Sequence, residues 1–122
     1  MTGWKEIFQH LEQGGFEVFP LGQHKGKCEL PYLVLRNNGA GHIRSIEAQE
    51  YEVLIYYPFE HYSGFEGYIG KVKDRMNELY PMVKLVDDQQ PHYPDDDVKA
   101  YMTSLIYRVP RISKANRMKL WR

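Results

Sequence analysis

The chain has 122 residues, of which 43% are hydrophobic, and this size predicts one folded domain with a single core. Lys and Arg balance Asp and Glu at 16 each, and the only cysteine, Cys28, excludes an internal disulfide and a thiol-based metal cage. No stretch approaches the roughly 20 apolar residues of a membrane span, and residues 1–5 do not begin a secretory signal, so we expect a protein that is cytosolic at synthesis.

The neutral total conceals an uneven distribution of charge. Residues 108–122 contain six bases and no acid, which leaves ten bases against sixteen acids in residues 1–107. The C-terminal segment is therefore +6 and the remainder of the chain is −6. Five of the acids crowd one short segment that contains no base: Asp87, Asp88, Asp95, Asp96 and Asp97.

The N-terminal part predicts a short helix, a brief strand and a polar loop. Apolar residues at helical spacing predict an amphipathic helix over residues 3–13, which stops at Gly14 and Gly15. A brief strand follows and breaks at Pro20. Residues 22–27 are polar and read as a mobile loop, for which we hypothesise contact with a partner through His24, Lys25 and Lys27.

Three strands are expected in the next part. The first covers residues 32–35, and residues 37–41, rich in Asn and Gly, should reverse the chain into a second strand from about residue 42 to 47. The third, residues 51–57, reads as a well-covered central strand because β-branched and aromatic residues occupy both of its faces. One of those faces consists of Val53, Ile55 and Tyr57.

The second half of the chain predicts a longer helix and two strands. Apolar spacings of three and four predict a helix over residues 65–79, with a capping box formed by Ser63 and Glu66. A short strand follows over residues 82–86, and then a turn-rich connection over residues 87–95. Strict alternation from Val98 predicts a long strand that Pro110 closes.

This order of elements predicts an α+β fold with a mainly antiparallel sheet of about five to six strands, because sequential strands tend to be neighbours. Two helices should pack on one face of that sheet. We expect a single domain over residues 1–110 and a flexible basic C-terminal tail over residues 111–122.

The search for a catalytic, metal or cofactor site finds no convincing group of residues. Cys28 with His24 could supply a nucleophile and its base, but no third group is identifiable to orient the histidine. Two groups could bind a divalent metal, but neither spacing puts two ligands on one regular face: His92 with Asp95 and Asp96, and Glu60 with His61. We therefore expect no enzyme activity, no metal and no cofactor.

The basic tail is the best functional signal. Three interpretations remain open: a solvated end, docking on an acidic neighbour, and phosphate contact with nucleic acid that is not sequence-specific. We hypothesise a contact between subunits in which the acidic segment meets the following basic residues: Arg108, Arg111, Lys114 and Arg117.

The layout resembles the tail-terminator, or tail-to-head joining, proteins of long-tailed bacteriophages. The resemblance rests on the opening helix from Gly3 to Phe8, the strand entry from Glu29 to Leu35, the helix from Gly64 to Leu79 and the closing strand from Ala100 to Val109. These segments form a common layout and contain no catalytic motif.

The resemblance implies a structural protein of the virion, assembled in the host cytoplasm. It implies a hexameric ring of identical subunits that caps the tail tube, with the tail-tube protein and the head-connector protein as partners, and no cofactor. A neck or minor capsid subunit would share this layout, and a small nucleic-acid-binding module or a small-molecule enzyme stays open as another class.

Overall fold

The computed structural model describes residues 3–24, 26–43, 46–87 and 91–112. It confirms the predicted α+β fold, with two α-helices, one 3₁₀ helix and a six-stranded sheet. In chain order the elements are α1 (Trp4–Gln13), β1 (Val18–Pro20), β2 (Tyr32–Ile43), β3 (Ile46–Pro58), η1 (Phe59–Gly64), α2 (Phe65–Asn77), β4 (Lys84–Asp87), β5 (Tyr93–Asp95) and β6 (Ala100–Ile112).

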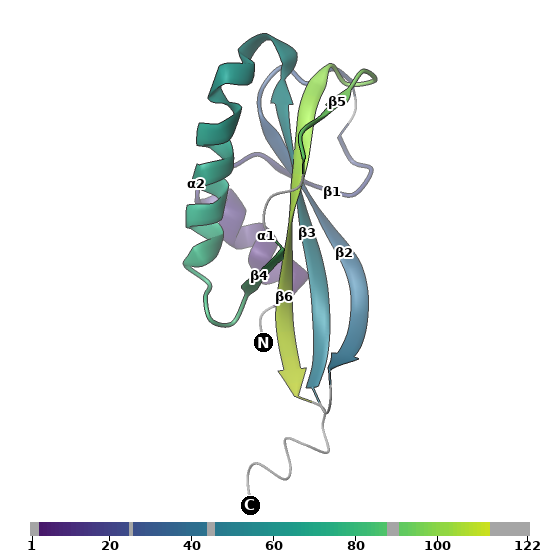
Figure 1. The fold of residues 1–122 in the computed structure, drawn as a ribbon, viewed down its shortest axis with the longest axis vertical. Coiled ribbons are helices and arrows are strands. Elements are labelled where there is room, and N and C mark those ends of the chain that lie inside the picture. Colours follow the sequence, from purple (N-terminus) through teal and green to yellow (C-terminus); the bar gives the residue numbers. More distant parts are fainter. Residues whose placement is uncertain (1–2, 25, 44–45, 88–90, 113–122) are drawn as a thin grey trace, which may run out of the picture.

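The sheet has the order β1-β2-β3-β6-β4, and β5 pairs with the part of β6 that β4 does not cover. Only β1 and β2 run parallel, and all other pairs are antiparallel. β3 therefore lies in the centre, as its sequence predicts. Figure 1 shows both α-helices on one side of this sheet and β1 and β4 towards its two edges.

The main core lies between the helices and this face of the sheet. Periodic apolar residues of α1 and α2 meet the inward residues of β2, β3 and β6, and they form one cluster. Its fully buried members include Ile7, Leu11, Leu33, Val53, Ile55, Phe65, Ile69, Val72, Met76 and Leu105. Burial of this kind stabilises by about 1.5 to 3 kcal/mol per large side chain.

A smaller cluster covers part of the opposite face. It contains Cys28, Tyr32, Val34 and Ala100, all buried, with Tyr56 packed against it. Because β2 contributes to the clusters on both faces, residues 32–35 are buried without a break. The residues that follow them in β2, residues 36–40, are all exposed.

Hydrogen bonds between side chain and backbone fix the two helices to each other. Arg75 Nε donates to the His10 carbonyl and His10 Nε2 donates to the Arg75 carbonyl, both at 2.8 Å. Trp4 Nε1 donates to the Leu35 carbonyl at 3.0 Å and ties α1 to β2. The helices are therefore joined by more than apolar contact.

The predicted chain reversal at residues 37–41 is wrong. β2 continues through these residues to Ile43, with a register shift between Asn37 and Gly39, and the chain reverses between Ile43 and Ile46. Gly39 has φ of 101°, and its N–H donates to Asn37 Oδ1 at 2.8 Å. The residues that tolerate positive φ thus form a β-bulge instead of a hairpin turn, and the separate strand expected over residues 42–47 is divided between β2 and β3.

Other features also differ from the prediction. α2 ends at Asn77 instead of residue 79, and β4 covers Lys84–Asp87 instead of residues 82–86. No capping side chain precedes α2, because η1 continues directly into it, with the Phe65 N–H donating to the Tyr62 carbonyl. β5 forms within the expected turn-rich connection. β6 does not close at Pro110 but continues to Ile112, which a proline permits because β4 pairs only as far as Arg108 and leaves the outer edge of β6 open there.

The end of β2, the beginning of β3 and the end of β6 form a three-stranded arm, defined here as residues 39–43, 46–50 and 108–112. These residues pair with one another beyond the segments that β1 covers, and β4 reaches only its first residue. Figure 1 shows the three strands continuing past both helices. The arm therefore extends the sheet along the long axis of the molecule.

Candidate interaction surfaces

The structure divides the acidic segment into two parts. Asp87 ends β4 and lies opposite Ile106, whereas Asp95 ends β5 and lies opposite Ala100. Ala100 and Ile106 are six steps apart along β6, which is about 20 Å along a strand. Asp96 and Asp97 follow in a turn in which the Asp97 N–H donates to Asp95 Oδ1 at 3.1 Å. Asp88 lies outside the described residues. The acidic turn is named here as Asp95, Asp96 and Asp97.

A chain of polar contacts fixes the segment that leads to the acidic turn. The Tyr62 hydroxyl lies 2.7 Å from His92 Nδ1, and His92 Nε2 lies 3.1 Å from Glu66 Oε1. The ring of His92 also packs on Phe65, with 4.6 Å between the ring centroids. Because both nitrogens of the imidazole are engaged, His92 joins the start of β5 to η1 and α2. The acidic turn is held by this cross-link.

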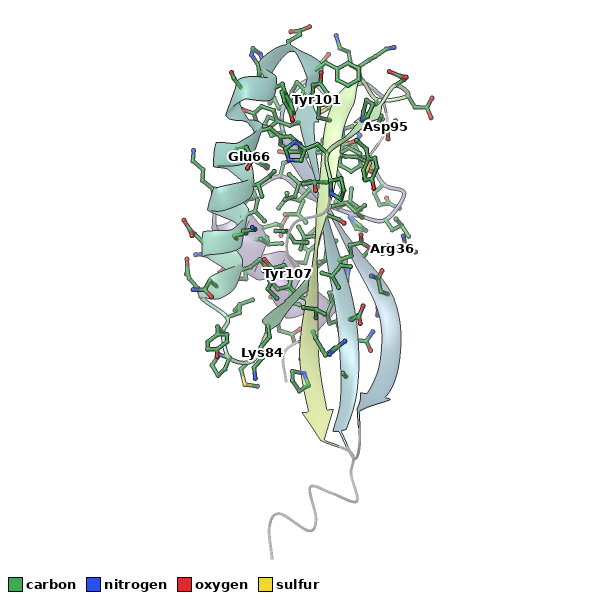
Figure 2. The ribbon with its side chains drawn as sticks, in the orientation of Figure 1. Arg36, Glu66, Lys84, Asp95, Tyr101 and Tyr107 are labelled. Atoms are coloured by element: carbon green, nitrogen blue, oxygen red, sulfur yellow. The ribbon has the colours of Figure 1, made fainter. Side chains whose placement is uncertain are left out.

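Sequence reasoning missed this cross-link and considered His92 only as a metal ligand beside Asp95 and Asp96. The three residues come from η1, α2 and the approach to β5, and no local spacing brings them together. Figure 2 shows Glu66 on α2 and Tyr101 on β6 near the same end of the sheet as Asp95. Tyr101 packs on Tyr62 at 4.4 Å, so aromatic contacts surround the chain of polar contacts.

The basic residues lie at the other end of β6. Arg108 Nη2 is 3.2 Å from Glu50 Oε2 on β3, so Arg108 has an acidic partner within its own chain. Residues 108–122 contain no acid, so the partner of Arg108 comes from a neighbouring strand. Arg111 belongs to β6 and lies opposite Glu47 in the register. Lys114 and Arg117 lie outside the described residues.

The two charged regions are too far apart to meet within one chain. β6 extends from Ala100, beside Asp95, to Ile112, and twelve steps along a strand span about 40 Å. Arg117 follows Ile112 by five residues, which reach at most about 18 Å when fully extended. The hypothesised contact of Arg111 and Arg117 with the acidic turn therefore requires two copies of the chain.

The loop over residues 22–27 is partly held by aromatic stacking. The His24 ring stacks on Tyr32 with 3.7 Å between centroids and packs edge-on against Phe19 at 5.0 Å. Lys27 Nζ lies 3.9 Å from Glu60 Oε1, and both side chains are largely exposed. Lys25 lies outside the described residues. The mobility of the loop and its contact with a partner stay predictions.

The environment of Cys28 does not favour the thiolate form that a nucleophilic cysteine requires. The thiol is buried, and its Sγ donates to the Leu30 carbonyl at 3.2 Å. Burial raises the pKa of Cys28 to about 11, so the thiol is protonated at neutral pH. Within the described residues, no three His, Cys, Asp or Glu side chains gather as a metal-binding group. In the same part of the chain, no helix is long and apolar enough to span a membrane.

Large apolar side chains are exposed at both edges of the sheet. Leu21 and Leu30 lie near the two ends of the connection between β1 and β2 and are 63% and 75% exposed. At the β4 edge, Tyr80 is 63%, Met82 55% and Leu85 42% exposed. Exposed apolar residues that form a contiguous patch indicate contact surfaces, whereas single ones need no explanation.

No family model matches this chain, and no curated protein sequence matches it. A proposal for the function therefore rests on two features of the structure. One is the pair of charged groups near the two ends of β6, and the other is the set of exposed apolar residues at the two edges of the sheet.

Proposed function

We propose that this protein is a structural subunit of a bacteriophage virion, which assembles into a ring that terminates the tail tube and joins it to the head connector. The proposal combines the resemblance in layout with one observation. The acidic turn and the end of β6 that leads into the basic tail lie about 40 Å apart, at opposite ends of one strand.

Each copy offers an acidic site at one end and a basic segment at the other, which permits a head-to-tail, heterologous contact or an antiparallel dimer in which both charge pairs form. The proposed ring requires the heterologous contact. A heterologous contact can repeat and close into a ring, whereas a self-complementary contact stops at a dimer. Each exposed ion pair contributes only about 0 to 1 kcal/mol. Charge therefore sets the register and encounter rate of the subunits, and apolar contacts at the sheet edges supply most of the affinity.

The test is a set of charge reversals followed by native mass spectrometry at low salt. One variant carries Arg111→Glu with Arg117→Glu, another carries Asp95→Lys with Asp97→Lys, and a third combines all four substitutions. The matched control, Lys5→Glu with Lys71→Glu, reverses two exposed charges on the helices. We expect each reversal to slow assembly, the combination to restore it and the control to have no effect. Normal assembly of either reversal variant would refute the pairing.

The basic tail also keeps nucleic acid as a second candidate partner. A fluorescence titration with DNA over a salt series distinguishes the two, since phosphate contacts give a steep decrease of affinity with salt. The slope of log affinity against log salt concentration reports how many counterions are released on binding. A slope that corresponds to several counterions, seen also with the variant that carries Asp95→Lys and Asp97→Lys, would favour nucleic acid over a neighbouring subunit.

A further inference from the structure

Two surfaces at opposite edges of the sheet carry exposed apolar side chains. The first is the apolar ridge, named here as Tyr80, Met82 and Leu85, which spans the turn after α2 and the start of β4. The second is a hollow of about 300 Å³ at the β1 edge, named here as the edge hollow. Its lining includes Glu17, His24, Glu29, Leu30, Pro31 and Tyr32.

The edge hollow has a firm floor. Tyr32 is buried and is stacked between His24, at 3.7 Å, and Tyr56, at 4.7 Å. This stack fixes the aromatic surface at the base of the hollow before any partner arrives. Leu30, by contrast, is 75% exposed at its rim, and an apolar side chain placed there would cover it. A rigid floor lowers the entropy cost of binding.

The charges on the two surfaces are complementary. Lys84 is exposed beside the ridge, between Met82 and Leu85 in the sequence, and Figure 2 shows it at the β4 side of the molecule. The hollow is lined by Glu17 and Glu29 and by one base, Lys27, which lies 3.9 Å from Glu60 outside the hollow. Lys73 and Asp74 offset each other beside Tyr80 and Leu85, which leaves Lys84 as the excess charge at the ridge. Acids outnumber Lys and Arg in the hollow, and opposite charges of this kind favour one orientation of contact.

We propose that the apolar ridge of one copy docks in the edge hollow of the next, and that this contact builds the ring. The inference rests on the proposed function, because it names the interface through which the copies join. Since β1 and β4 are the two outermost strands, each subunit presents the ridge at one edge and the hollow at the other. A contact from the ridge of each copy to the hollow of the next is heterologous, and such a contact can close around a symmetry axis.

The test uses two single-cysteine proteins in a Cys28→Ser background, which removes the native thiol. One carries Met82→Cys and the other Leu30→Cys, both at exposed positions. After mixing and mild oxidation with diamide, a disulfide-linked dimer should form between the two proteins and not within either protein alone. The control replaces Met82→Cys with Tyr93→Cys, because Tyr93 is similarly exposed at 53% and lies on neither surface. Cross-linking of Met82→Cys with itself would overturn the proposal.

A second experiment separates this inference from the proposed function. Tyr80→Asp with Met82→Asp should raise the concentration needed for half-assembly about tenfold or more, as expected for loss of a central apolar contact. Circular dichroism should show an unchanged fold, since both side chains are exposed. If the parent forms a ring and this variant assembles equally well, the inference fails and the proposed function stands. If the parent is monomeric at every concentration, both fail.

Discussion

Two consecutive parts of β2 differ sharply in burial, although they belong to one continuous strand. They are named here the covered half, residues 32–35, and the exposed half, residues 36–40. Residues 32–35 are buried, with β1 on their outer edge and apolar clusters on both faces, whereas residues 36–40 are exposed. The change follows the sequence, since Tyr-Leu-Val-Leu gives way to Arg-Asn-Asn-Gly-Ala. The covered half is stabilised by apolar side chains that are packed out of contact with water. The half that leads into the arm is held by strand pairing and by polar contacts between strands, such as Asn38 Nδ2 donating to Glu52 Oε1 at 3.1 Å.

The largest effect should come from removing packing in the covered half. Leu33 is 0% exposed in the main core, so Leu33→Ala should lower the free energy of unfolding by about 2 to 5 kcal/mol through lost burial and the cavity it leaves. Asn38→Ala, in the exposed half of the same strand, is the matched control and should cost less than about 1 kcal/mol. Urea denaturation of both variants measures the difference. Equal losses of unfolding free energy would contradict the distinction between the covered and exposed halves of β2.

The next largest effect is the pH dependence of stability that comes from Cys28, which packs with Tyr32 and Val34 of the covered half. The pKa of Cys28 rises from 9.0 to about 11 in the folded chain, because burial disfavours the thiolate. The contribution to stability is present below pH 9 and is lost as the pH rises through 11, since the unfolded chain loses this proton first. Over that window it amounts to on the order of 2 kcal/mol.

Cys28→Ser removes this titration and keeps a small hydroxyl donor. The variant should lose less stability than the parent between pH 9 and 11 in urea titrations. Burial also raises the pKa of Tyr32, Tyr68 and Tyr107, so part of the alkaline loss should persist in the variant. Identical pH profiles for the two proteins would show that Cys28 is not desolvated.

A smaller effect is expected where polar groups join the helices. Arg75→Ala removes the 2.8 Å hydrogen bond to the His10 carbonyl and the 3.1 Å contact with Glu78, and we expect a loss of about 1 to 2 kcal/mol. Lys71→Ala, at an exposed position on the same helix, serves as the control. Thermal unfolding should separate the two variants, and an Arg75→Ala protein as stable as the control would contradict the role of these bonds.

The smallest effect should occur in the arm. Arg108 and Glu50 form an ion pair whose side chains are 33% and 37% exposed, so solvent screens their attraction. Arg108→Ala should therefore cost less than about 1 kcal/mol in the isolated subunit. A double-mutant cycle with Glu50→Ala measures the coupling, and a value above about 2 kcal/mol would show that the arm is held as firmly as the covered half.

Local sequence patterns predict the covered part of the fold well. The helices α1 and α2 follow from apolar spacings of three and four, and the central strand follows from its apolar residues on both faces. The bulge at Gly39 could not be told from a turn, because positive φ serves both and only the pairing of β2 with β3 decides between them. The passage of β6 through Pro110 likewise depends on which of its edges has a neighbour.

The candidate surfaces depend on contacts between distant residues, which the sequence does not display. The cross-link of Tyr62, His92 and Glu66 joins residues up to 30 positions apart. The charge split is visible in the sequence, but only the length of β6 shows that the acidic turn lies about 40 Å from the end of β6 that leads into the basic tail. The edge hollow and the apolar ridge appear only when β1 and β4 are placed at opposite edges.

The most direct test of the central claim, that copies of this chain join through a heterologous contact, is native mass spectrometry of the parent protein over a range of concentrations. The account predicts a single closed oligomer with a fixed number of copies, without a prominent dimer, because a heterologous contact that closes leaves no free surface. A population that ends at the dimer, or a monomer at every concentration, would contradict it.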